Sequence, residues 1–130
     1  MKARARVAIV AALVGLLGLA APGASATTTR YLHENDSGRT IHVSRGDVIK
    51  VRLPGGSMSG YHRPRTSDSD VVDRTNASGG YPSDDKARAR FVARHRGTAD
   101  LTSYTDYTCL HTDPRCLPPQ REWTVHVVVH

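Results

Sequence analysis

The seven histidines are the residues of this chain best suited to chemistry, because an imidazole can carry a proton or bind a metal. They are His33, His42, His62, His95, His111, His126 and His130. Their spacing matches no common metal motif, and His126 and His130 fall on the outer face of a predicted strand. The one arrangement left is a weak, opportunistic site in which His42 and His126 are cross-strand neighbours. We therefore predict no resident metal and no cofactor.

Catalysis would need a nucleophile with its base, a pair of carboxylates or a metal. The sequence has no Gly-x-Ser-x-Gly elbow, and its Ser-Met-Ser-Gly stretch at residues 57–60 lacks the lysine and helix start of a phosphate loop. Serines and aspartates are frequent in predicted turns, where their side chains bond to the backbone. We therefore predict that the chain is not an enzyme.

Two cysteines, Cys109 and Cys116, are separated by six residues. In an exported protein a disulfide between them is the expected state. His111 lies between the two thiols and leaves a metal site as the alternative, but the spacing fits no common zinc pattern. A disulfide closing so short a loop is expected to contribute about 2–3 kcal/mol and to shape residues 110–115.

The first 26 residues have the organisation of an export signal. Lys2, Arg4 and Arg6 precede an uncharged stretch over residues 7–20, and Ala-Ser-Ala at residues 24–26 is a signal-peptidase site. The apolar run is shorter than the roughly 20 residues of a membrane span, so a retained anchor is the less favoured alternative. We predict a signal peptide over residues 1–26 and one domain over residues 27–130, secreted or at the cell envelope, with no stable membrane insertion.

The basic character of the whole chain comes partly from that signal. The chain has 18 Lys and Arg against 12 Asp and Glu, a net charge of +6. The signal holds three of the cations and no acid, so residues 27–130 have 15 Lys and Arg against 12 Asp and Glu, a net charge of +3. Charges of both signs alternate along the chain, and no basic run is interleaved with aromatic residues, so a nucleic-acid partner is not expected.

The elements that position these residues are predicted to be strands. Apolar and polar residues alternate, and Gly and Pro punctuate the alternation. Strands are predicted over residues 39–43, 48–53, 86–92, 98–104 and 123–130, with a weak one at 71–72 and a long polar loop reaching residue 65. Residues 86–92 are rich in Ala and Arg and would also suit a helix, but their strict alternation favours a strand. The pattern predicts an all-β sandwich or a small barrel.

Three loops between these strands are the candidate binding surface, because loops at one end of a sandwich form a surface on a rigid scaffold. The alternative is that they are simply turns. The candidate residues of the first loop are Ser57, Met58, Ser59, Gly60 and Tyr61. Those of the second loop are Ser78, Gly79, Gly80 and Tyr81. Those of the third loop are His111, Thr112, Asp113, Pro114 and Arg115.

A series of short motifs follows in order from residue 38 to residue 129. A Gly46-Asp47 turn precedes Arg-Leu-Pro-Gly at 52–55, Ser-Gly-Tyr at 59–61 and Ser-Gly-Gly at 78–80. Phe-x-Ala-x-x-x-Gly-x-x-x-Leu then covers residues 91–101, and a final strand starts at Trp123. In order and spacing these motifs resemble the chagasin-like inhibitors of papain-type cysteine proteases, which are small immunoglobulin-like β-sandwiches.

The resemblance implies a wedge of three loops that enters a protease cleft. Residues 59–61 would lie nearest the catalytic Cys and His of the protease, and residues 78–80 would make the second contact. Three departures from the family pattern stand out. Gly56-Ser57 replaces Asn-Pro, Arg63 replaces a Trp, and the third loop has the Cys109 and Cys116 insertion where the family has Arg-Pro-Trp.

We therefore predict a secreted, monomeric, protein-binding domain that reversibly inhibits papain-type cysteine proteases. The alternative is a non-inhibitory secreted or cell-surface module, structural or adhesive, that uses the same loops. Substituting Gly60→Glu is expected to abolish inhibition and leave the fold intact. Clustering of His33, His42 and His126 would instead favour a metal- or ligand-binding domain.

Overall fold

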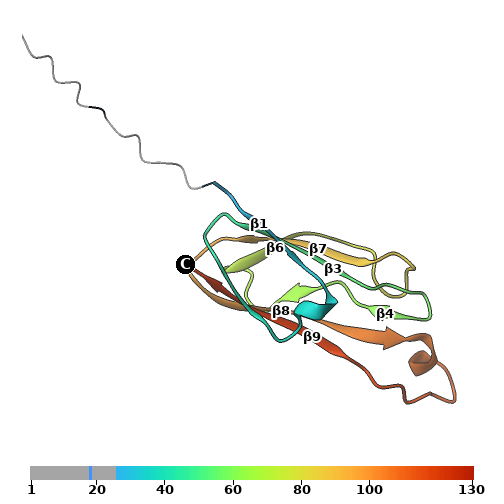
Figure 1. Ribbon diagram of the computed structural model, residues 1–130. Helices are drawn as coiled ribbons and strands as arrows, with labels where there is room; N and C mark the ends of the chain where they lie inside the picture. Colours follow the sequence, from blue (N-terminus) through green and yellow to red (C-terminus); the bar gives the residue numbers. More distant parts are fainter. Residues whose placement is uncertain (1–17, 19–25) are drawn as a thin grey trace, which may run out of the picture.

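Two β-sheets face each other and enclose the apolar side chains between them (Figure 1). The computed structural model describes residue 18 and residues 26–130. The predicted signal peptide lies outside the described residues except for Gly18 and Ala26. In the part of the chain that is described, no helix is long and apolar enough to cross a membrane.

The first sheet has four strands in the order β1-β3-β7-β6. Their bounds are β1 Thr29–Leu32, β3 Val48–Leu53, β7 Ala87–Ala93 and β6 Val72–Ser78. The edge strand β1 pairs with β3 in parallel, and the other neighbours are antiparallel. This sheet is called sheet A below.

The second sheet, sheet B, has the order β2-β9-β8-β4, with β5 also paired to β8. Its strands are β2 Thr40–Val43, β9 Glu122–Val129, β8 Gly97–Tyr107, β4 Ser59–Tyr61 and β5 Arg65–Thr66. Two short 3-10 helices, η1 (Glu34–Asp36) and η2 (Thr108–His111), lie between strands. The chain therefore places β1 at an edge of sheet A and, after η1, β2 at an edge of sheet B.

The core follows the alternation of the sequence, because every second side chain of a strand points to the same face. In β9 the side chains of Trp123, Val125, Val127 and Val129 are buried. Trp123 also donates its indole N–H to the carbonyl oxygen of His33 at 3.0 Å, which ties η1 to sheet B. The predicted inner faces of β3, β7 and β8 are buried in the same way. The prediction of an immunoglobulin-like β-sandwich is confirmed, and residues 87–93 form a strand rather than a helix.

The main differences from the predicted strands lie where the sequence shows no alternation. The predicted polar loop up to residue 65 contains β4 and the start of β5. Strand β6 extends to residue 78, well beyond the weak strand predicted at 71–72, and β1 was not predicted. Both β4 and β5 form because β8 is 11 residues long and offers each of them backbone partners. A short strand of this kind depends on its neighbour rather than on its own sequence.

Candidate functional site

The three candidate loops lie together at the end of the sandwich remote from the C-terminus (Figure 1). We call them loop 1 (residues 54–62), loop 2 (residues 78–86) and loop 3 (residues 108–121). They meet because β3 and β8 end, and β7 and β9 begin, at this same end of the two sheets. The topology thus brings together segments that are about 25 residues apart in the chain.

Loop 1 turns tightly back on itself. The amide of Tyr61 donates to the carbonyl oxygen of Pro54 at 3.0 Å. A β-carbon on Gly60 would lie 2.6 Å from the backbone nitrogen of Gly56 and 2.8 Å from the carbonyl carbon of Gly55. Only a residue without a side chain fits there unless the backbone moves. Gly60→Glu would therefore displace the backbone of loop 1, which the expectation of an intact fold did not include.

Loop 1 divides its residues between support and surface. Tyr61 is 4% exposed, and its hydroxyl donates to Oε1 of Glu34 at 3.1 Å. Burial raises the pKa of the Tyr61 phenol, and the neighbouring Glu34 carboxylate raises it further. Ser57, Met58 and Ser59 are exposed, and Met58 is 79% exposed. Tyr61 therefore anchors the loop, and residues 57–59 form its outer surface.

Loop 2 packs against loop 1 through its glycines. Gly79 and Gly80 have φ angles of +63° and +79°, which favour glycine. A β-carbon on Gly79 would overlap the carbonyl oxygen of Lys86, and one on Gly80 would lie 3.0 Å from the carbonyl oxygen of Tyr61. That oxygen of Tyr61 also accepts the amide hydrogen of Tyr81, at 2.9 Å. Glycine is thus required in loop 2 both for its backbone angles and for the close approach to loop 1.

Further hydrogen bonds join loop 1 to both other loops. The amide of Ser57 donates to Oδ1 of Asp84 in loop 2 at 2.8 Å, and this bonding lowers the pKa of Asp84. In loop 3 the amide of Thr108 donates to the carbonyl oxygen of Met58 at 2.9 Å, and its hydroxyl donates to that of Ser57 at 2.8 Å. The exposed tip of loop 1 is therefore held on both sides.

Loop 3 contains the predicted disulfide between Cys109 and Cys116, with a Cα–Cα distance of 5.3 Å. The amide of Cys116 also donates to the carbonyl oxygen of Cys109 at 3.1 Å. The five candidate residues His111, Thr112, Asp113, Pro114 and Arg115 are all exposed. Leu117, just after the disulfide, is 95% exposed. The disulfide thus closes the base of a loop whose tip is in solvent.

One carboxylate connects loops 1 and 3. Asp106 lies at the end of β8, and its side chain is 10% exposed. Its Oδ2 accepts a hydrogen bond from Nε2 of His62 at 2.8 Å, and its Oδ1 accepts one from Nε2 of His111, also at 2.8 Å. The amide of Tyr107 donates to the same Oδ1 at 2.7 Å. We call this group, His62, Asp106 and His111, the His–Asp–His bridge.

The electrostatics of the bridge favour a charged carboxylate. Burial alone would raise the pKa of Asp106, but the hydrogen bonds from His62, His111 and the Tyr107 amide outweigh it. The pKa of Asp106 is consequently held below its ordinary value of 3.8. Near neutral pH both histidine rings are therefore bonded to an ionised carboxylate.

Loop 2 joins the bridge through Tyr81. The ring of Tyr81 stacks on that of His111 with centroids 6.1 Å apart, and it meets the edge of the His62 ring at 5.5 Å. Arg63 adds a second link, because its Nε donates to the carbonyl oxygen of Gly79 at 3.0 Å. Arg63 stands where the chagasin-like family has a Trp, and it attaches loop 2 to the segment that follows loop 1.

His62, Asp106 and Arg63 were not among the predicted site residues. His62 and Asp106 are 44 positions apart, and no motif links them in the sequence. The one available signal was the position of His62, directly after the Ser-Gly-Tyr motif. The predicted loop residues do come together: Gly60, Tyr61 and Gly80 are buried, Gly79 and Tyr81 are half-buried, and the others are exposed.

The clustering of His33, His42 and His126 that would have favoured a metal- or ligand-binding domain is not found. His42 lies opposite Val128 in the sheet, and its Nδ1 is 2.8 Å from Nε2 of His130. His126 instead contacts Oδ1 of Asp100 through its Nδ1, at 2.6 Å. Within the described residues there is no group of three or more His, Cys, Asp or Glu that could hold a metal ion.

Comparisons with known proteins give structural matches and no sequence matches. No protein-family model matches the sequence, and no curated protein matches it. The cysteine protease inhibitor EhICP2 from Entamoeba histolytica is similar in structure, with a TM-score of 0.59 and 18% sequence identity, over 80% of this chain and 97% of EhICP2. Amebosin matches with a TM-score of 0.51 and 17% identity, over 81% of this chain and all (100%) of amebosin.

A third match is PbICP-C, whose structure was solved in complex with falcipain-2. Its TM-score is 0.46 at 14% identity, over 80% of this chain and 91% of PbICP-C. The two better matches span 80% and 81% of this chain and nearly the whole of each relative. The chain therefore has the fold of the cysteine protease inhibitor EhICP2 and of amebosin, as its resemblance to the chagasin-like family predicts.

Proposed function

We propose that this chain is a secreted, reversible protein inhibitor of papain-type cysteine proteases that acts through loops 1, 2 and 3. The observation that carries the proposal is the cross-bonding of the three loops into one unit at one end of the sandwich. Two further supports are the inhibitor-like motifs in their order along the chain and the fold shared with EhICP2, which is a cysteine protease inhibitor.

Rigid loops favour tight inhibition because little conformational entropy is lost when they bind. Loop 1 is fixed to loop 2 by the Ser57–Asp84 bond and to loop 3 by Thr108. Such a loop can lie across a protease cleft with its backbone held away from the geometry that cleavage requires. The sequence lacks the family's Asn-Pro in loop 1, and we infer that these cross-links replace its rigidity.

The exposed apolar residues also favour this end of the molecule as the binding surface. Among the described residues the large exposed hydrophobic side chains are Tyr31, Met58, Tyr104 and Leu117. Met58 lies in loop 1, Leu117 lies in loop 3, and Tyr104 lies on β8 beside His62, with ring centroids 4.5 Å apart. Burying apolar side chains in a partner is favourable, and tyrosine and methionine are enriched in protein interfaces.

The direct test is titration of oxidised residues 27–130 against papain with a fluorogenic peptide substrate. We expect reversible, stoichiometric loss of activity. Absence of inhibition at micromolar protein, with circular dichroism showing the β-fold, would contradict the proposal. It would favour the alternative, a non-inhibitory secreted or cell-surface binding module.

Variants locate the binding surface. We expect Met58→Asp to weaken inhibition about tenfold or more, because it places a charge in the interface. Tyr31→Asp is the matched control, since Tyr31 is also a large exposed side chain but lies on β1, away from the loops. Equal effects of the two variants would show that the loops are not the contact surface. Replacing both cysteines by serine is expected to weaken inhibition as well, by loosening loop 3.

A further inference from the structure

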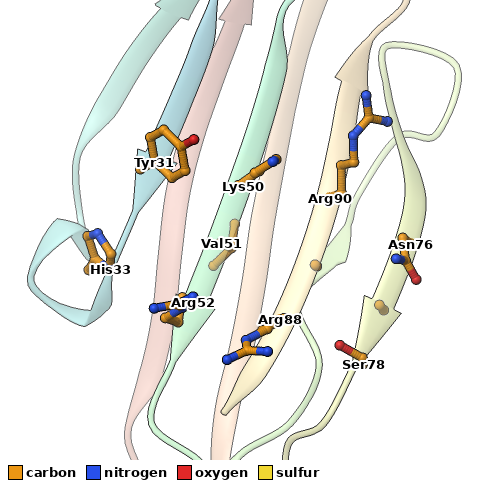
Figure 2. Close-up of a pocket in the computed structure, with 11 residues that line it drawn as sticks. Tyr31, His33, Lys50, Val51, Arg52, Asn76, Ser78, Arg88 and Arg90 are labelled. Atoms are coloured by element: carbon orange, nitrogen blue, oxygen red, sulfur yellow. The ribbon is translucent and has the colours of Figure 1, made fainter.

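The outer face of sheet A has a cluster of four cationic side chains. Lys50 and Arg52 lie on β3, and Arg88 and Arg90 lie on the neighbouring β7. In the register of the two strands Lys50 is opposite Arg90 and Arg52 is opposite Arg88. Figure 2 shows the four side chains on adjacent strands of one face, with Tyr31 and His33 at one side and Asn76 and Ser78 at the other. We call these four residues the cationic face.

This arrangement is unfavourable for the sandwich alone. Like charges directly opposite each other on antiparallel strands repel and lower stability. Lys50 lies 6.0 Å from the centre of the Tyr31 ring, and Arg90 donates to Oγ1 of Thr75 at 2.9 Å. Within residues 26–130, none of the four forms an ion pair. The cationic face thus has four positive side chains on two adjacent strands and, in the described part of the chain, no acidic side chain paired with them, which favours the binding of an anion.

The cationic face surrounds a hollow with a volume of about 370 Å³. Tyr31, Asn76 and Ser78 add an aromatic ring, an amide and a hydroxyl to its lining, which contains no Asp or Glu. We propose that this face binds an acidic polysaccharide. The Arg and Lys side chains would pair with its carboxylate or sulfate groups, the Tyr31 ring would pack on a sugar ring, and Asn76 and Ser78 would bond to sugar hydroxyls.

Two other polyanions fit the face less well. A single nucleic-acid strand is usually held by several aromatic rings on which successive bases stack, and the hollow has one Tyr, Tyr31, and the smaller imidazole of His33 beside it. An anionic membrane surface is usually bound by cations together with apolar side chains that enter the lipid. The other large exposed hydrophobic residues of the described chain, Met58, Tyr104 and Leu117, belong to the loop end instead. Sugars with acidic groups match what the face does offer.

The test compares two double charge reversals in the oxidised chain. Lys50→Glu/Arg52→Glu removes half of the cationic face. Arg45→Glu/Arg96→Glu changes the net charge equally, at exposed positions in the turns before β3 and before β8, at the opposite end of sheet A from the loops. Binding is measured by calorimetry with heparin for sulfated sugars and with polygalacturonate for carboxylated sugars.

We expect the unmodified chain to bind at least one of the two polysaccharides, and Lys50→Glu/Arg52→Glu to weaken that binding about tenfold or more. The control double variant should bind nearly as well as the unmodified chain. Equal weakening by the two variants, or no binding of either polysaccharide by the unmodified chain, would overturn the proposal. So would tighter, equally face-dependent binding of oligo-dT or of phosphatidylserine vesicles. Thermal unfolding verifies that each variant is folded.

Discussion

At the level of single residues, the geometry of the three loops depends on a few residues that contact other parts of the loops rather than a binding partner. Asp106 holds His62 of loop 1 and His111 of loop 3, and Tyr81 of loop 2 packs on both imidazoles. Gly60 allows the backbone of loop 1 to pass close to itself. Substitutions at these positions should therefore affect loop geometry first and binding as a consequence.

The first prediction concerns the charge of Asp106. Because the folded-state pKa of Asp106 is lowered, its bonds stabilise the folded chain above the ordinary carboxyl pKa and are lost as pH falls through the folded-state value. We expect Asp106→Asn to lower the free energy of unfolding at about pH 7 by about 1.5–3 kcal/mol, the usual value for hydrogen bonds to a charged group. The deficit should shrink at an acidic pH below the folded-state pKa of Asp106, where the unmodified chain also loses this charge.

Urea unfolding at both pH values measures this difference. Asp113→Asn is the matched control. Asp113 is an exposed carboxylate of loop 3, and among the described residues none donates a hydrogen bond to its side chain or forms an ion pair with it. It should change the free energy of unfolding little at either pH. A deficit for Asp106→Asn that is the same at both pH values would show that the loss is not due to the carboxylate charge.

The second prediction compares two glycine-to-alanine substitutions, one that causes a steric clash and one that causes backbone strain. Gly60→Ala should weaken papain inhibition and lower the free energy of unfolding by about 1–3 kcal/mol, since its methyl group collides with the backbone of loop 1. Gly46→Ala is the comparison. Gly46 has a φ of +91° with open space around it, at the far end of the sandwich, so alanine there should cost about 1–2 kcal/mol in strain.

Inhibition constants and denaturant midpoints measured together distinguish the two variants. We expect Gly46→Ala to inhibit papain as well as the unmodified chain, despite its lower stability. If Gly60→Ala also inhibited normally, the close approach within loop 1 would be irrelevant to binding.

At the level of elements, the pairing of β3 with β7 decides the chemistry of a whole sheet face. Their register places Ile49 and Phe91 opposite each other in the core, and it fixes Arg52 opposite Arg88 on the outer face. A shift of one residue would turn the apolar side chains outward, so the core sets the register. The cationic face is thus a consequence of residues whose own packing is determined on the other side of the sheet.

The third prediction is that stability and polyanion binding respond in opposite directions at Arg52. Arg52→Glu should raise the free energy of unfolding by about 0.2–1 kcal/mol, because it replaces a like-charge cross-strand pair by an attractive one with Arg88. The same substitution should weaken heparin binding. Arg45→Glu, in an exposed turn, is expected to change neither quantity by as much. Loss of stability in Arg52→Glu would contradict the repulsion argument.

At the level of the whole molecule, the sandwich presents two surfaces with different chemistry. The loop end is rich in aromatic and apolar residues, and the outer face of sheet A is cationic. A net charge of only +3 for residues 27–130 does not reveal this separation. The two proposed activities, inhibition of a protease and binding of an acidic polysaccharide, therefore belong to separate surfaces.

The fourth prediction follows from that separation. Lys50→Glu/Arg52→Glu should inhibit papain with an unchanged inhibition constant, and Met58→Asp should bind heparin with unchanged affinity. The two surfaces share no residue, and distant, independent sites usually behave additively. Measuring both activities on both variants checks this independence. A loss of both activities in either variant would indicate a single surface or a folding defect.

The sequence by itself was sufficient to predict the β-sandwich fold and to locate the three loops along the chain. Strict alternation in β3, β7, β8 and β9 fixes which side chains enter the core, and this pattern is local, so it can be read along the chain. The Cys109–Cys116 disulfide was also predictable, because the two cysteines lie close together in the sequence. The predicted signal peptide and the assignment of the loops to protease binding remain predictions.

Only the tertiary structure decided how distant residues combine. The short strands β4 and β5 exist because β8 gives them backbone partners, and the His–Asp–His bridge joins positions 62, 106 and 111. The register of β2 on β9 likewise decides that His42 lies opposite Val128 and not opposite His126, so the alternative of a cross-strand histidine pair is not realised. The cationic face arises in the same way, from two strands about 40 residues apart. Such groups depend on which strands pair and in which register, and both are set by packing of the shared core rather than by any local sequence signal.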